Sequence, residues 1–194
     1  MFDLNFIINR IRNIVFIPVN EWEVIKNENH NVQRILVNYL LPIIFTIGLA
    51  DLLGGLIFES FFSLTYRVLS ACFAMFIPFV TIIVTSFLIS ILAPSFGAKN
   101  DFSSSLKLVT YSFSIQLVLN IITNLLPFLS IIGILGLYYI FIIWHGVVPV
   151  MNVSGEKRVS FVILSVLIIL VISILCSFLF NLLLTPFMVT NIEI

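Results

Sequence analysis

Charged side chains are scarce in this sequence. They make up 9% of its 194 residues, whereas hydrophobic residues make up 61%. A typical soluble domain carries about 25% charged residues, and it needs a polar surface around its core. A chain with so few charges cannot cover such a surface, so the lipid bilayer is the natural solvent for the excess apolar area. The formal net charge is zero, so no global field attracts nucleic acid or acidic substrates.

Cysteine and the usual signatures of catalysis are also rare or absent. The two cysteines, Cys72 and Cys176, both lie within apolar segments, where a thiol usually behaves as a small apolar side chain. A metal site would need further His, Cys or carboxylate partners at fixed spacing. The sequence contains no phosphate-binding glycine loop, no HExxH motif and no Ser-His-Asp arrangement in a loop. We therefore expect no catalytic residue, no metal and no cofactor.

Long apolar segments are what the sequence has instead. Each holds about 20 or more residues, enough to cross a hydrocarbon core of about 30 Å at 1.5 Å per residue. Pro127 must break the helix between the third and fourth segments, so we expect a tight hairpin there. The sequence predicts an all-α polytopic membrane protein, with a bundle of five transmembrane helices within residues 32–185 and a short extracytoplasmic tail, 186–194. The five predicted spans are 35–57, 68–92, 106–126, 128–150 and 159–184.

The N-terminal segment, residues 1–31, contains an amphipathic helix. Apolar residues from Leu4 to Val15 follow helical spacing and share one face, while polar residues cover much of the other. The stretch is too short and too polar to span a membrane. It fits an in-plane helix at the membrane surface, with Arg10 and Arg12 near lipid phosphates, and it fits equally a helix docked on the protein's own spans. Trp22 fits the interfacial aromatic belt.

The cationic residues predict the orientation of the spans. If the N-terminus is cytoplasmic, eight of the nine Lys and Arg residues face the cytoplasm and only Arg67 faces out. The positive-inside rule favours this arrangement, which places the C-terminus outside the cytoplasm. We expect a prokaryotic cytoplasmic (inner) membrane protein. The eight cytoplasmic cations are Arg10, Arg12, Lys26, Arg34, Lys99, Lys107, Lys157 and Arg158.

Asp51 is the only acidic residue within a predicted span. An ionisable residue inside a membrane is by default a functional-site hypothesis. We favour the alternative that Asp51 is a partly hydrated acid near the outer end of its span, because the predicted spans offer it no Lys or Arg partner.

A polar stripe lies late in the third span. Gln116, Asn120 and Asn124 follow helical spacing, and Tyr111 extends the same stretch. This stripe is the best candidate for a polar interior, although interhelical hydrogen bonding is the commoner use of such residues.

Trp144 and His145 lie near the inner end of the fourth span. Histidine can titrate near neutral pH or bind a metal, but a lone histidine has no ligand set. We interpret the pair as residues of the interfacial belt.

Several soft patterns together resemble one membrane protein family. They are Pro18-x3-Trp22-x2-Ile25, the run from Tyr111 through Pro127 to Gly136, Trp144-His145-Gly146 and Ser154-Gly155-Glu156-Lys157. The chain resembles, over nearly its whole length, the Yip family of five-span proteins named for interaction with Ypt/Rab GTPases. The resemblance implies a non-enzymatic factor that acts through protein partners. The chain has a short N-terminal segment like that of prokaryotic members, so a Rab-type GTPase is not expected as its partner.

Two functions follow as hypotheses. The first is a membrane-organising or scaffold factor of the trafficking type, which acts through lipids, other membrane proteins or a homo-oligomer. The alternative is a small transporter or channel that uses Asp51 and the stripe on the third span, since breakers such as Pro42 and Pro78 can expose backbone groups to a substrate.

Overall fold

The computed structural model describes residues 3–28, 31–58 and 62–187, and within these ranges the secondary-structure elements are helical, with no β-strand element. The α-helices are α1 (Leu4–Phe16), α2 (Pro18–Asn27), α3 (Val32–Ile35), α4 (Leu41–Phe58), α5 (Leu64–Leu92), α6 (Phe102–Ser112), α7 (Ser114–Leu125), α8 (Tyr139–Met151) and α9 (Arg158–Leu184). Other helical turns are the π-helix η1 (Leu36–Leu40) and the 3₁₀ helices η2 (Ala93–Phe96), η3 (Pro127–Tyr138), η4 (Gly155–Lys157) and η5 (Thr185–Phe187).

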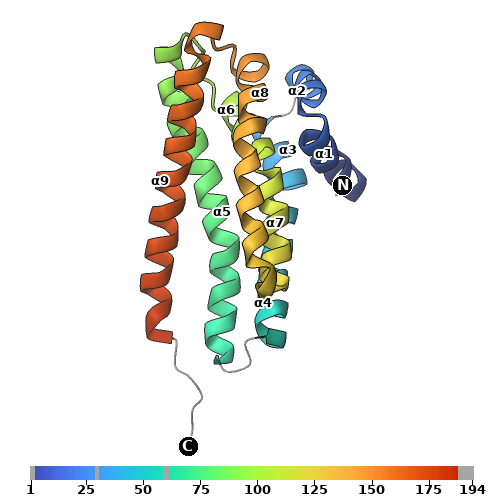
Figure 1. Cartoon of the computed structure of the whole chain (residues 1–194), viewed down its shortest axis with the longest axis vertical. Coiled ribbons are helices and arrows are strands. Elements are labelled where there is room, and N and C mark those ends of the chain that lie inside the picture. Colours follow the sequence, from blue (N-terminus) through green and yellow to red (C-terminus); the bar gives the residue numbers. More distant parts are fainter. Residues whose placement is uncertain (1–2, 29–30, 59–61, 188–194) are drawn as a thin grey trace, which may run out of the picture.

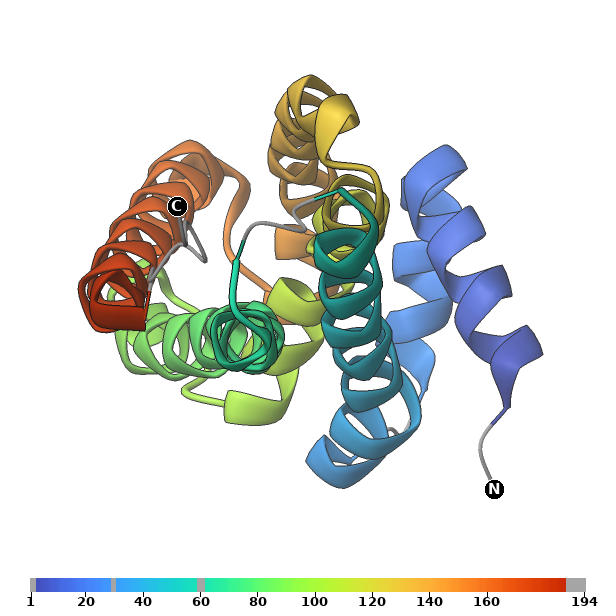
Figure 2. The same ribbon diagram turned by 90° about the horizontal axis from the view of Figure 1, so that it is seen from below.

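The long helices form a bundle, and the first two helices form a separate layer beside it. Helix α5 contacts α4, α6 and α9, while α4 also packs against α7 (Figure 1). Helices α1 and α2 lie outside the bundle, on the side away from α9 (Figure 2). They reach the bundle mainly through α6, α7 and α8. We call α1 and α2 together the N-terminal cap.

Four helical stretches of the described chain are long and apolar enough to cross a membrane. They are Val32–Phe58, Leu64–Phe96, Pro127–Met151 and Gly155–Phe187. Helices α6 and α7 pass the same test only as a pair, bent by 44°. The pair makes a fifth span if it crosses as one unit. The all-helical, membrane-spanning class is therefore confirmed, and the number five stays a prediction.

A serine lies at the bend between α6 and α7. The Ser114 hydroxyl donates a hydrogen bond to the Tyr111 carbonyl oxygen at 2.6 Å, and it also lies 2.6 Å from the Tyr39 hydroxyl. A serine hydroxyl that bonds the backbone one turn earlier competes with the helical ladder and bends the helix. The bend therefore coincides with a buried polar contact between α7 and η1.

The hairpin region around Pro127 contains an element that the sequence did not predict. Helix α7 ends at Leu125, and Pro127 begins the 3₁₀ helix η3, which folds back against α7. A 3₁₀ helix rises about 2.0 Å per residue instead of 1.5 Å. The first half of the predicted fourth span is therefore narrower and more extended than an α-helix, and Gly136 brings it close to α7: a methyl group added there would lie 1.7 Å from Gln116 Oε1.

Polar side chains fix the start of several helices. Asp3, Asn31, Ser63 and Asp101 each accept a backbone N–H from the first turn of the helix that follows. Partial burial raises the pKa of Asp101, but hydrogen bonds from Ser104 and Ser103 outweigh it and hold that pKa below its usual value. Ser63 matters most for the site described below, because it starts α5 at Leu64, four residues before the predicted span.

The crossing of α4 and α7 depends on a glycine. A methyl group at Gly54 would lie 2.0 Å from the backbone oxygen of Asn124, whereas one at Gly55 would lie 3.9 Å from the Arg67 Cγ. A methyl group at Gly54 would therefore force the backbone to move, whereas one at Gly55 would make an ordinary van der Waals contact.

We predict that Gly54→Ala lowers the stability of the protein by about 1–3 kcal/mol, the usual range for overpacking. The neighbouring Gly55→Ala should be neutral or slightly stabilising, because alanine favours a helix over glycine. Thermal unfolding of the purified protein in detergent micelles measures both. Equal midpoints for the two variants would contradict the close crossing.

Candidate functional site

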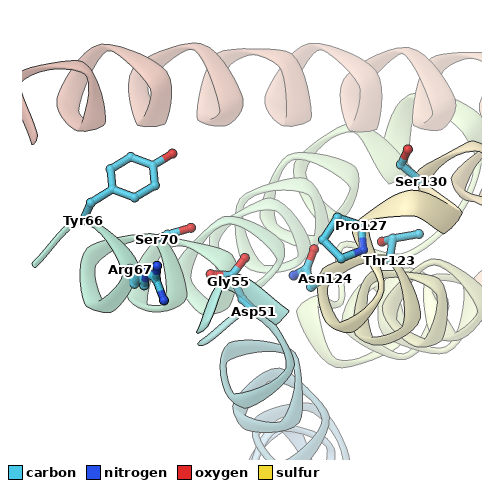
Figure 3. A pocket seen from close by; sticks show the side chains of 9 residues that line it. All are labelled: Asp51, Gly55, Tyr66, Arg67, Ser70, Thr123, Asn124, Pro127 and Ser130. Atoms are coloured by element: carbon cyan, nitrogen blue, oxygen red, sulfur yellow. The ribbon is translucent and has the colours of Figure 1, made fainter. Parts of the chain in front are cut away.

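A polar cavity of about 230 Å³ lies where α4 ends and α5 begins. Figure 3 shows its side chains gathered from α4, α5, α7 and η3 around one space. The lining residues are Asp51, Gly55, Tyr66, Arg67, Ser70, Thr123, Asn124, Pro127 and Ser130. The cavity thus collects the one acidic residue of the predicted spans and part of the predicted stripe, although these lie more than 70 residues apart in the sequence.

Arg67 corrects the reasoning about Asp51. The sequence predicted that Arg67 lies in an outer loop and that no cation lies within the spans near Asp51. In the structure Arg67 lies in the first turn of α5 with an exposed fraction of 7%, and it lines the same cavity as Asp51. Arg67 lies in the helix and not in a loop because Ser63 caps α5, which therefore starts at Leu64 instead of residue 68. Two charges of opposite sign within one cavity lower the free-energy cost of burying each other inside a membrane.

Two further cavities continue from the first one. The second, of about 230 Å³, shares Asp51, Ser70 and Asn124 with the first. The third, of about 330 Å³, shares Asn120 and Pro78 with the second. We call this row of three cavities the polar track.

The predicted stripe lines the polar track along α7. Asn124 faces the first two cavities, Asn120 the second and third, and Gln116 the third. The Gln116 Nε2 donates a hydrogen bond to Asn120 Oδ1 at 2.9 Å. The structure therefore brings Asp51 and the stripe residues together, as the sequence suggested for a polar interior.

Tyr111 does not belong to the polar track. It is buried on α6, where its ring packs edge-on against Tyr39 with 4.9 Å between centroids. The Arg10 guanidinium carbon lies 5.3 Å from the Tyr111 ring centroid. Tyr111 precedes the bend between α6 and α7, which turns it away from the direction of Gln116.

A second polar site, which the sequence analysis missed, holds the N-terminal cap. The Arg10 Nη1 donates a hydrogen bond to Glu21 Oε1 at 2.6 Å, and its Nη2 donates to Glu28 Oε1. Lys107 on α6 donates to the Glu28 backbone oxygen at 2.7 Å. We call Arg10, Glu21, Glu28 and Lys107 the cap cluster. The available signal was the presence of two acids, Glu21 and Glu28, after the proline that separates them from Arg10, in a chain with few charges.

Arg10 and Trp22 therefore differ from their predicted interfacial positions. The Arg10 side chain is buried, rather than directed at lipid phosphates, while Arg12 is exposed as expected for the polar face of α1. Trp22 is fully buried, and its Nε1 donates to the Ile142 carbonyl oxygen at 2.9 Å. Gly146 makes room for it: a methyl group there would lie 2.5 Å from Trp22 Cε2. Trp22 anchors the cap to α8.

Trp144 and His145 lie half-buried in the middle of α8. The Arg158 guanidinium carbon stacks 4.1 Å from the Trp144 ring centroid, and Arg158 Nε donates to the Trp144 carbonyl oxygen at 3.0 Å. His145 packs edge-on against Phe141. In the described part of the chain, no three His, Cys, Asp or Glu side chains form a group that could hold a metal ion.

Comparison with protein families identifies the chain at the level of its domain. A family model described as the Yip1 domain matches residues 12–177, which is most of the sequence. The resemblance stated from the sequence is confirmed by this match. A search of curated proteins and a search of solved structures each found no match.

The cap cluster generates a stability prediction. Removal of the Arg10 guanidinium leaves Glu21 buried without its charge partner, which typically costs about 3–5 kcal/mol. We expect Arg10→Ala to release the cap, so that limited proteolysis cleaves between α2 and α3 before the bundle unfolds. Arg12→Ala, on the exposed face of the same helix, should change stability by no more than about 0.5 kcal/mol. Equal protection in both variants would contradict this role of the cluster.

Proposed function

The chain belongs to the Yip1 domain family, and from that premise we propose that it is a non-enzymatic, membrane-organising protein. It acts at the cytoplasmic face through its N-terminal cap, by contact with lipids, with partner membrane proteins or with a second copy of the chain. Its integral membrane character rests on the family match and on the long apolar helices.

One observation carries this proposal. One face of α1 packs against the rest of the protein, and a neighbouring face is apolar and exposed. Ile7, Arg10 and Ile14 are buried toward the rest of the protein, while Leu4 and Ile8 stay exposed. An exposed apolar strip beside polar residues is typical of a helix that lies in the membrane surface. The two alternatives left open by the sequence are thus compatible. The cap cluster holds the helix rigidly, and the strip formed by Leu4 and Ile8 faces the bilayer.

The distribution of cations supports the proposed orientation. Lys99 follows the end of α5, and Lys157 and Arg158 stand at the start of α9, whereas Arg67 stands at the start of α5. The start of α9 and the end of α5 lie at the same end of the bundle (Figure 1). The positive-inside rule assigns that end to the cytoplasm, and with it a cytoplasmic N-terminus and an extracytoplasmic C-terminus in a prokaryotic inner membrane.

A photoreactive phenylalanine analogue tests the proposal when it replaces Ile8 or, as the matched control, Asn9. Both positions are exposed on α1 but lie on different faces. After irradiation in native membranes, position 8 should form adducts with lipid, with a membrane protein or with a second copy, as detected by mass spectrometry. Position 9 should form few. Equal yields at the two positions, or adducts at neither, would contradict a membrane-directed face.

The polar track favours a second candidate, a small transporter for protons or monovalent cations. Asp51 and Asn120 line one cavity of this track, and ionisable groups inside membranes often mark ion pathways.

We predict for this candidate that purified protein in liposomes gives a cation or proton flux and that Asp51→Asn abolishes it. Asp101→Asn is the control, because Asp101 lies outside the polar track and asparagine caps a helix as well as aspartate does. A flux that is absent, or that persists in Asp51→Asn, removes the transporter.

A further inference from the structure

The third cavity of the polar track lies between α5, α7, α9, the end of η3 and the start of α8. Its volume is about 330 Å³. Thr81 of α5 and Ser173 of α9, which line it, both lie near the middle of their helices. We call it the mid-membrane cavity.

Two hydroxyl groups in the mid-membrane cavity have unused hydrogen-bonding capacity. Thr81 has an exposed fraction of 2% and Tyr139 of 5%. Neither Thr81 Oγ1 nor the Tyr139 hydroxyl makes a hydrogen bond within the described residues. Buried polar groups are nearly always satisfied in proteins, and both residues line the cavity, so a molecule bound there can supply hydrogen-bonding atoms to these two hydroxyls.

The wall of the polar track also presents a backbone acceptor. Pro78 has no N–H, so it cannot donate the helical hydrogen bond to the Ala74 carbonyl oxygen. Both Pro78 and Ala74 line the second cavity, which continues into the mid-membrane cavity at Pro78 and Asn120.

The lining of the mid-membrane cavity favours an uncharged ligand over a charged one. Its polar side chains are those of Thr81, Gln116, Asn120, Tyr139, Ser173 and Ser177. All of these are uncharged, so an ion would lose its hydration without gaining a counter-charge, which is strongly unfavourable. The matching chemistry is that of hydroxyl, ester or carbonyl oxygens.

The mouth of the cavity opens toward the bilayer. Leu137 of η3 and Leu170 of α9 line the cavity, and their exposed fractions are 52% and 41%. Exposed leucines on helices that are long and apolar enough to span a membrane face lipid rather than water. A ligand therefore reaches the cavity laterally, from within the hydrocarbon.

We propose that the mid-membrane cavity binds an uncharged lipid by the oxygen atoms of its polar end. The Tyr139 and Thr81 hydroxyls donate hydrogen bonds to those oxygens, and the hydrocarbon tail leaves between Leu137 and Leu170. A diacylglycerol and an isoprenoid quinone both present this chemistry. The site belongs to the bundle rather than to the cap, so it stands independently of the proposed organising function.

Native mass spectrometry of the purified full-length protein in detergent tests this site. The probes are dioleoylglycerol and a short-chain menaquinone, with dioleoylphosphatidylglycerol as the charged comparison. We expect one or both neutral probes to bind, and phosphatidylglycerol to bind more weakly. Which neutral probe binds identifies the source of the oxygens, and binding of either supports the site.

Two variants that each remove one side-chain hydroxyl test whether the lipid binds in this cavity. Tyr139→Phe and Thr81→Val should each weaken the neutral lipid by about three- to tenfold, which is the usual effect of one lost hydrogen bond. Both should fold, since the two hydroxyls make no hydrogen bond within the part of the chain that the structure describes. Tyr138→Phe is the matched control, because its hydroxyl donates to the Val15 carbonyl oxygen at 3.1 Å, away from the cavity.

Three outcomes would overturn the proposal. They are unchanged affinity in Tyr139→Phe and Thr81→Val, equal binding of phosphatidylglycerol, and failure of both neutral probes to bind the native protein.

Discussion

Lipid hydrocarbon offers no hydrogen-bond donor or acceptor, and this constraint decides where each polar group of the chain lies. The backbone of the apolar segments is helical, which satisfies its own N–H and C=O groups. Several hydroxyls within these helices turn back onto their own backbone, as Ser86 does on the Ile82 carbonyl oxygen at 2.6 Å and Ser165 on that of Phe161 at 2.8 Å. Asp51, Asn120 and Asn124 collect along the polar track.

The same constraint explains why the cap is tied so firmly to the bundle. Arg10 is buried, and a buried charge is tolerated only with partners that satisfy it. Glu21 and Glu28 provide them, and Lys107 and Trp22 then connect the cap to α6 and α8. An apolar strip on α1 is thereby held in a fixed position relative to the spans. The polar groups of the chain thus form two separate sets. The cap cluster lies at the side of the bundle, and the polar track lies between its helices.

Hydropathy and helical spacing predicted the helical class and placed Gln116, Asn120 and Asn124 on one face, because both depend on local periodicity. They did not predict the partners of Arg10, the burial of Trp22 or the position of Arg67. Those depend on how distant segments pack and on where a cap such as Ser63 starts a helix. The 3₁₀ conformation of η3 also escaped prediction, because hydropathy does not distinguish it from an α-helix.

The central claim is that α6 and α7, despite their bend, cross the bilayer as one span, so that the chain crosses five times. Single cysteines on a background without Cys72 and Cys176 test it through labelling by a membrane-impermeant maleimide from either side of oriented vesicles. Suitable positions are Asn5, Ser63, Asn100, Phe128 and Ser154. The account predicts that Asn5→Cys, Asn100→Cys and Ser154→Cys react from the cytoplasmic side, and that Ser63→Cys and Phe128→Cys react from the other. Labelling of Asn100→Cys and Phe128→Cys from the same side would make the bent pair a re-entrant loop and contradict the account.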